Sequence, residues 1–142
     1  MKNLILLLIM SILVTSCTIK NDFDYIISIQ WKKCNKDENC IIDFSNSMPF
    51  EWDTMYYYSG VNSLEDINKD LGFELKDFTD IGDRVFFVKG NKVVYQKEWF
   101  SNPSEPKEGT IFIPEQNKFR INKSNAKFKI KKKDKVFYLE KY

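Results

Sequence analysis

The stretch RVFFVKGNKVVYQKEW (84–99) decides the fold, because it joins two apolar runs through a tight turn. The dipeptide Gly90-Asn91 suits a type II′ hairpin turn, in which glycine takes the first central position. That turn sets two pairs of residues opposite each other, Val88 with Val93 and Phe86 with Tyr95. Residues 85–88 are apolar without a break, so both faces of this strand need cover. We therefore expect a hairpin whose first strand is central in a sheet.

Other segments carry shorter strand and helix patterns. Aromatic and β-branched residues dominate four stretches that we predict as strands, namely 40–44, 52–58, 110–114 and 118–122. Residues 63–72 predict a short helix, with Ser63 as its N-cap and Gly72 as its left-handed stop.

The segment 22–34 fits two patterns, because its apolar residues alternate as in a strand and also fall on one helical face. Acidic residues at its start (Asp22 and Asp24) and basic residues at its end (Lys32 and Lys33) match the helix dipole. These charges favour a helix.

The tail AKFKIKKKDKVFYLEKY (126–142) predicts a second hairpin. A tight turn at Lys133-Asp134 places four apolar residues on one buried face by pairing Ile130 with Phe137 and Phe128 with Leu139. On the other face, Lys127 falls opposite Glu140 as a cross-strand charge pair.

Together these elements predict one small α+β domain. We expect a mostly antiparallel sheet of about six strands, with one or two short helices on one face. The length of 142 residues suits a single domain, and the aromatic content argues against disorder.

The N-terminus carries a separate signal. Lys2 precedes an apolar run, 4–14, which is interrupted only by Ser11 and is too short to cross a bilayer as a helix. Val14-Thr15-Ser16 then precedes Cys17. This order resembles the lipobox of bacterial lipoproteins, which is an aliphatic residue, two small residues and a cysteine.

The lipobox resemblance implies that residues 1–16 are a lipoprotein signal peptide. It also implies that Cys17 carries a diacylglyceryl group and an amide-linked acyl chain such as palmitate. Residues 17–22 would then form a lipidated tether and residues 23–142 the globular α+β domain. An ordinary secreted protein with a free Cys17, or a buried N-terminal helix, remains the alternative.

Lipidation would place the protein in the bacterial cell envelope. Several acyl chains anchor a protein stably, so we expect a membrane anchor with the domain in the periplasm or on the cell surface. Loss of residues 1–16 removes one lysine and leaves a net charge of +1. A chain so nearly neutral has no global signature of nucleic-acid binding.

Cys34 and Cys40 remain as an even pair in an oxidising compartment, which predicts a structural disulfide; two free thiols are the alternative. The chain has no histidine, the commonest general base and zinc ligand. Phosphate-loop and calcium-loop motifs are also lacking. We therefore expect no catalytic residues, no metal site and no cofactor.

Residues 50–60 (FEWDTMYYYSG) are the densest unusual stretch. A strand there would place one face in the core and expose aromatic residues on the other. Tyrosine and tryptophan are enriched at interaction hot spots. The candidate binding residues are Trp52, Asp53, Tyr56, Tyr57 and Tyr58. The alternative is that they pack the core and the sheet faces.

Residues 50–99 are also similar to a set of small uncharacterised bacterial envelope proteins. The shared features are Phe-x-Trp-Asp (50–53), Leu71-Gly72 and the hairpin 84–99. The resemblance implies no known activity. In the plain interpretation, Asp53 accepts a hydrogen bond that orders the entrance to the strand.

Three hypotheses about function follow. The first is a non-catalytic, lipid-anchored envelope protein that binds a protein or glycan. The second is an inhibitor or immunity protein against a toxin or cell-wall hydrolase. The third is a small envelope enzyme that uses Glu51 and Asp53 as an acid/base pair.

The lysine-rich run 127–135 also has two interpretations. Its alternating lysines would touch anionic lipid or polysaccharide, or they would protect an edge hairpin from aggregation.

Overall fold

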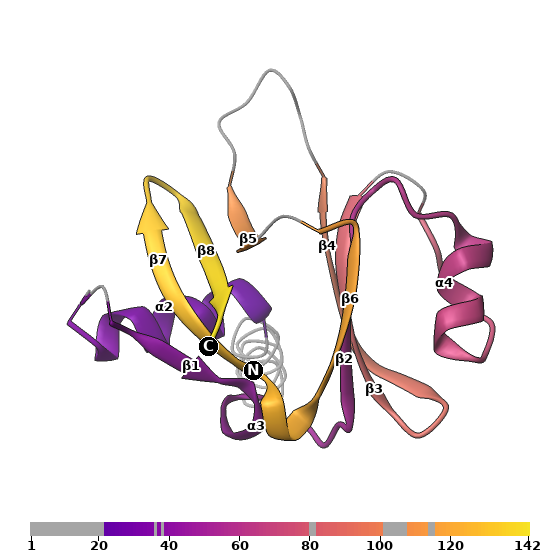
Figure 1. The fold of residues 1–142 in the computed structure, drawn as a ribbon, viewed down its shortest axis with the longest axis horizontal. Helices are drawn as coiled ribbons and strands as arrows, with labels where there is room; N and C mark the ends of the chain where they lie inside the picture. The colour runs from indigo at the N-terminus through magenta and orange to yellow at the C-terminus, as the bar shows by residue number, and fades with distance from the viewer. Residues whose placement is uncertain (1–21, 36, 38, 80–81, 101–107, 114–115) are drawn as a thin grey trace, which may run out of the picture.

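A computed structural model describes residues 22–35, 37, 39–79, 82–100, 108–113 and 116–142 (Figure 1). The helices are α2 (Phe23–Lys33), α3 (Phe44–Ser47) and α4 (Leu64–Leu71), with a 3-10 turn η2 (Lys123–Asn125). The strands are β1 (Ile41–Asp43), β2 (Thr54–Tyr58), β3 (Gly82–Lys89), β4 (Lys92–Phe100), β5 (Gly109–Ile113), β6 (Lys118–Asn122), β7 (Lys127–Lys133) and β8 (Val136–Lys141). The predicted signal peptide (1–16) and Cys17 lie outside the described residues.

The described strands form two four-stranded sheets. Sheet A has the order β1-β7-β8-β5, and sheet B has the order β4-β3-β2-β6. Pairing is antiparallel throughout except between β5 and β8, which run parallel. The α+β class and the dominance of antiparallel pairing are confirmed. The strands nevertheless divide between two sheets instead of forming the single sheet of about six that we expected.

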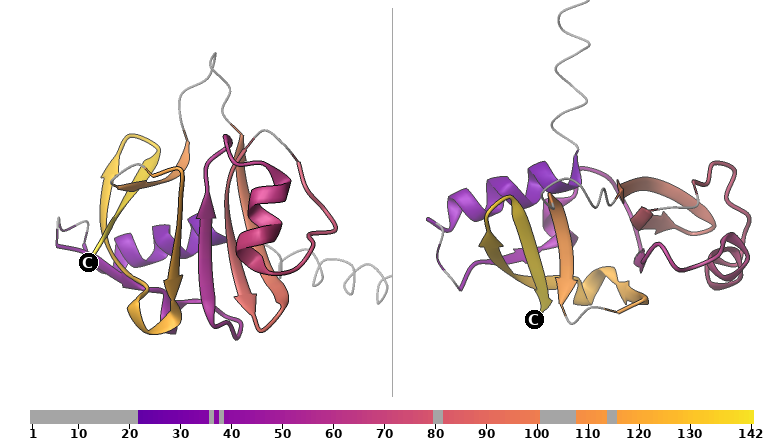
Figure 2. Two further views of the ribbon diagram at one scale, coloured as in Figure 1. Left: turned by 45° about the vertical axis from the view of Figure 1, so that its right-hand side comes forward. Right: turned by 90° about the horizontal axis from the view of Figure 1, so that it is seen from above.

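The division into two sheets follows from the apolar character of β3 on both faces. Val85 and Phe87 join a core that residues of α2, sheet A and sheet B share. Phe86 and Val88 point the other way and pack against Ile67 of α4. The helices therefore lie on two sides of sheet B instead of on one face, with α4 outside it and α2 against the shared core (Figure 2).

The β3–β4 hairpin is confirmed, and β3 is an internal strand of sheet B. Gly90 has a φ of 57°, as the first central position of a type II′ turn requires. Val88 lies opposite Val93 as predicted, but a bulge follows, and Tyr95 then pairs with Phe87 instead of Phe86. The bulge adds one residue to β4, which brings Tyr95 onto the core face of the sheet.

Both longer helices begin as their sequences indicate. The segment 22–34 is helical, and the Asp22 side chain caps it by accepting a hydrogen bond from the backbone N–H of Asp24. Ser63 caps α4 through the backbone N–H of Asp66, and Gly72 ends that helix with a φ of 78°. Asp22, the last residue of the predicted tether, is therefore already part of the folded domain.

The C-terminal hairpin turns one residue later than predicted. Its turn lies at Asp134-Lys135, where Asp134 has a φ of 54°, and Ile130 consequently pairs with Leu139 instead of Phe137. The shift equals two positions along the partner strand, so the four apolar residues still share the buried face. The expected Lys127–Glu140 pair is not formed, because the new register sets Lys129 opposite Glu140.

We predict that Phe87→Ala will destabilise the protein by about 3–5 kcal/mol, because it removes a large side chain from the centre of the core. The Phe87 ring contacts five other aromatic rings, those of Phe23, Phe44, Phe50, Trp52 and Tyr95. Urea unfolding followed by tryptophan fluorescence measures the loss. Val61→Ala, at a side chain that is 76% exposed, is the control. Equal unfolding midpoints for the two variants would contradict the central place of Phe87.

Candidate functional site

The aromatic candidates of residues 50–60 lie inside the protein. Trp52 is buried and meets Phe87 edge to face, with ring centroids 4.9 Å apart. Tyr57 belongs to the same core. Tyr56 and Tyr58 stack on the opposite face of β2, beneath α4. The structure thus divides these residues between two apolar clusters, as the core-packing interpretation expects, and gathers no aromatic binding surface from them.

Asp53 is the exposed member of the candidate set, and it has a structural partner. Its carboxylate accepts a hydrogen bond from the backbone N–H of Gly90 at 2.9 Å. Its own backbone N–H donates to the carbonyl of Val88 at 2.8 Å. The expected role of Asp53 in ordering the strand entrance is therefore observed, and its target is the β3–β4 turn.

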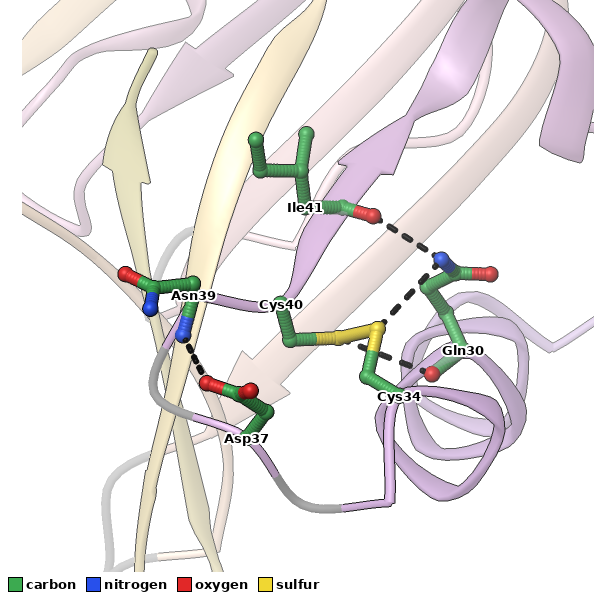
Figure 3. The surroundings of a disulfide bond; sticks show 6 residues. All are labelled: Gln30, Cys34, Asp37, Asn39, Cys40 and Ile41. Atoms are coloured by element: carbon green, nitrogen blue, oxygen red, sulfur yellow. Dashed lines mark hydrogen bonds between the residues drawn. A yellow bond between two sulfur atoms is a disulfide. The ribbon is translucent and has the colours of Figure 1, made fainter.

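Cys34 and Cys40 form a disulfide that ties the end of α2 to the start of β1 (Figure 3). Their Cα atoms lie 5.5 Å apart. Gln30, one helical turn before Cys34, strengthens the same junction by donating a hydrogen bond to the carbonyl of Ile41 at 2.9 Å. The two cysteines therefore form a structural disulfide, as predicted.

A polar cluster holds the other end of α2. Asp22 accepts a hydrogen bond from Lys97 at 2.6 Å. Asp24 accepts hydrogen bonds from the indole N–H of Trp99 at 2.9 Å and from the hydroxyl of Thr110 at 2.7 Å. These contacts join the helix to β4 and β5, so they fix the point at which the predicted tether enters the domain.

Two titratable groups of this cluster have raised pKa values. Burial alone would lower the pKa of Lys97, but the hydrogen bond that it donates to Asp22 and the charge of Asp24 outweigh burial and raise the pKa. Burial raises the pKa of Tyr95, whose hydroxyl accepts a hydrogen bond from the backbone N–H of Phe23 at 2.8 Å. Both groups hold their protons more tightly in the folded protein, so neither is suited to act as a base at neutral pH.

The buried Arg84 also serves the structure. Its side chain is 1% exposed and donates hydrogen bonds to the carbonyl of Gly82. The guanidinium lies 3.6 Å from Glu98 and 4.2 Å from the ring centre of Phe78. Arg84 therefore stabilises the segment that connects α4 to β3.

The densest positive charge lies on β7 and β8. Residues 127–142 contain seven lysines and two acidic residues. Protection of an edge hairpin was one interpretation of this run. In the structure, β7 lies between β1 and β8, and β8 lies between β7 and β5. Strand β1 pairs with β7 only at Lys127–Lys129, however, so among the described residues the end of β7 (131–133) has no strand partner on that side. Edge protection therefore applies at most to that end of the hairpin, and the lysines of the paired part need another explanation.

Four of these lysines form a row on the side of sheet A that points away from the core, which we call the outer face. Strand β7 buries Phe128 and Ile130 in the core. Alternation along the strand therefore turns to the outer face Lys127, Lys129, Lys131 and Lys133. This row, the lysine ladder, is not covered by any helix of the described residues, whereas α4 covers the outer side of sheet B.

A small cavity of about 130 Å³ lies between the two sheets. It opens between β5 and β6, which are end strands of their sheets. Phe112 and Phe119 line it, with their ring centroids 5.0 Å apart, and Arg120 and Lys141 stand at its rim. A cavity of this size holds a guest about as large as benzene, well below the several hundred Å³ of ordinary ligand pockets.

Sequence reasoning missed the cavity and left open which role the lysine run has. The cavity draws on four strands that share no motif, and the exposure of the lysine ladder depends on which strands flank β7. Among the described residues, no three His, Cys, Asp or Glu side chains are grouped to hold a metal ion. No helix of the described part has the length and apolar character needed to span a membrane.

We predict that the raised pKa of Lys97 makes the protein lose stability at alkaline pH. The contribution of its ion pairs is fully present below about pH 10 and fades as pH rises through the raised pKa of the folded state. The free energy of unfolding, from urea titrations between about pH 9 and pH 12, should fall more steeply for the wild type than for Lys97→Met. Lys92→Met, at an exposed lysine, should follow the wild type. Parallel profiles for wild type and Lys97→Met would refute the assignment.

Comparison with protein-family models, with curated proteins and with solved structures gives no match for this chain. Its function therefore has to be inferred from the surfaces and contacts described above.

Proposed function

We propose that this protein is a non-catalytic, lipid-anchored protein of the bacterial cell envelope, whose domain binds a protein or glycan partner. The observation that carries the binding role is the lysine ladder on the outer face of sheet A, which no helix of the described residues covers. Lys127 and Lys129 lie where β1 pairs with β7, so they are not needed to block an edge. Their retention on an open face is typical of a surface that meets an acidic partner.

The position of the folded domain relative to its proposed anchor supports this role. Asp22, five residues after Cys17, is already held by Lys97. Five extended residues reach about 17 Å, so the domain would stay close to the membrane. Viewed from above, α2 lies along one side of the molecule and the C-terminal end of β8 lies on the opposite side (Figure 2). The tether would thus enter on the side of α2, away from the C-terminal end of β8.

The contacts of the two carboxylates considered for catalysis support a non-catalytic protein. Asp53 is engaged with the β3–β4 turn. Glu51 is 76% exposed and lies 3.7 Å from Lys89 and 3.6 Å from Lys123. Glu51 is thus an exposed partner of surface ion pairs, as a solvated carboxylate is expected to be.

The anchor predicts a specific intact mass for the natively expressed protein. We expect the mass of residues 17–142 plus a diacylglyceryl group and an acyl chain, because cleavage precedes the lipidated cysteine. Reduction should add about two hydrogens for the Cys34–Cys40 disulfide. Cys17→Ala should carry no lipid. An unmodified full-length mass for the wild type would reject the lipoprotein assignment.

The binding role predicts that the partner depends on the lysine ladder. Full-length lipoprotein, purified from membranes in neutral detergent, should retain a stoichiometric partner from envelope extract. Lys129→Glu/Lys133→Glu should lose this partner, because two unfavourable charges replace two favourable ones. Lys69→Glu/Lys76→Glu changes the same net charge at exposed lysines elsewhere and should keep it.

Equal retention by both double variants, or no retention by the wild type, would reject the proposed binding face. If the retained partner is a toxin or cell-wall hydrolase that loses activity in the complex, the protein is an inhibitor, which is the narrower form of the same function.

A further inference from the structure

We propose that the outer face of sheet A binds a linear anionic polysaccharide, which lies along strand β7. The proposal rests on the binding function proposed above and names the chemical class of the partner. It follows from the spacing of the lysine ladder, from its incomplete neutralisation, from its neighbours on the same face and from its place in the molecule.

The lysine ladder is an evenly spaced row of cations. Its members occupy alternate positions of one β-strand, so their Cα atoms repeat about every 6.8 Å over the length of β7. The row is held in place because β8 pairs with β7 from Phe128 to Lys133 and β1 pairs with it from Lys127 to Lys129. A linear polymer with a charge on each repeating unit matches such a row better than a compact acidic protein does.

Carboxylates of the sheet neutralise two of the four lysines. Lys127 lies 3.8 Å from Asp43, and Lys131 lies 2.9 Å from Glu140. Each of these acidic residues is on the outer face, because it lies on a neighbouring strand beside the lysine ladder.

The other two lysines have no carboxylate of the described residues within ion-pair distance. Lys129 instead lies 3.4 Å from the side-chain oxygen of Asn39. Lys133 is exposed at the end of β7 beside the turn. Lys129 also lies opposite Glu140, and its charge helps to lower the pKa of that carboxyl. The four lysines thus share two carboxylates, Asp43 and Glu140, and the excess positive charge of the row is left for a ligand.

The neighbours of the lysine ladder suit a sugar ring. Tyr138 lies directly opposite Lys131, and Ile111 lies opposite Tyr138 on the next strand. Both side chains are half-buried, so each presents part of its apolar surface beside the cations. A flat tyrosine ring between charged groups offers the amphipathic contact that a sugar requires, with its apolar C–H face and polar edge.

Charge is also separated across the molecule. Residues 62–83, which include α4, carry seven acidic residues and two lysines, the reverse of the C-terminal hairpin. Figure 1 shows α4 and the β7–β8 hairpin on opposite sides of the fold. The resulting field draws a polyanion to sheet A and keeps it from the side that bears α4.

The test uses polygalacturonate, a linear polysaccharide with one carboxylate on each sugar, and the full-length lipoprotein in neutral detergent. Titration calorimetry should detect binding of polygalacturonate and none of neutral dextran. Lys129→Glu/Lys133→Glu should weaken binding by about tenfold or more, since several exposed charge pairs are lost or reversed. Lys69→Glu/Lys76→Glu should retain the wild-type affinity. Unchanged urea midpoints will establish that the variants are folded.

A second variant separates a sugar site from a merely basic surface. Tyr138→Ala keeps every charge, so weaker binding of polygalacturonate with unchanged binding of poly-glutamate supports contact between the ring and the sugar. Stronger binding of poly-glutamate than of polygalacturonate by the wild type would overturn the proposal in favour of an acidic protein. Preference for vesicles of anionic phospholipid would overturn it in favour of a membrane surface.

Failure of this proposal is distinguishable from failure of the proposed function. If polygalacturonate does not bind but the envelope partner is still lost in Lys129→Glu/Lys133→Glu, the polysaccharide is rejected and the binding face stands. If neither the polymer nor an envelope partner binds the wild type, both are rejected.

Discussion

The structure depends on one constraint, which is that strand β3 is apolar on both of its faces. Val85 and Phe87 need cover on one side, and Phe86 and Val88 need it on the other. Burial of each large apolar side chain contributes about 1.5–3 kcal/mol, so neither face can be left in water. Sheet A with α2 meets the first requirement and α4 meets the second. The two-sheet arrangement is therefore a consequence of four consecutive residues.

The same constraint determines which surfaces remain for a partner. Strand β2 pairs with β3 and shares its two-sided environment, so the aromatic residues between Trp52 and Tyr58 are drawn into the two clusters. The outer side of sheet B is taken by α4. The outer face of sheet A, in contrast to that of sheet B, is covered by no helix of the described residues. This face carries the lysine ladder. Surface charge and burial thus both support the proposed binding face.

Helix α2 links these parts because it is held at both ends. The cluster of Asp22, Asp24 and Lys97 joins its start to β4 and β5. The disulfide joins its end to β1, at the far edge of sheet A. In between, Phe23 and Ile27 fill the shared core. A short helix of marginal intrinsic stability is thereby fixed across the interior.

The sequence by itself determined the local elements, because their physics involves residues only a few positions apart. The turn at Gly90, the helix caps at Asp22 and Ser63, and the stop at Gly72 all depend on such short-range hydrogen bonds and φ angles. The sequence also identified the buried face of the C-terminal hairpin. The register shift equals two positions, so each side chain stays on the same face of its strand. The lipid anchor at Cys17 remains a prediction from the sequence.

Only the tertiary structure decided the strand register, the order of strands in each sheet and the exposed surfaces. These features depend on contacts between segments far apart in the chain. The bulge before Val88 moved Tyr95 to the core face, where a distant backbone N–H, that of Phe23, needed its hydroxyl. Pairing of β7 with β1, and of β8 with β5, turned an apparent edge hairpin into the centre of sheet A. Whether each lysine of β7 lies at an edge or beside a paired strand depends on β1, a distant segment that the local pattern does not contain.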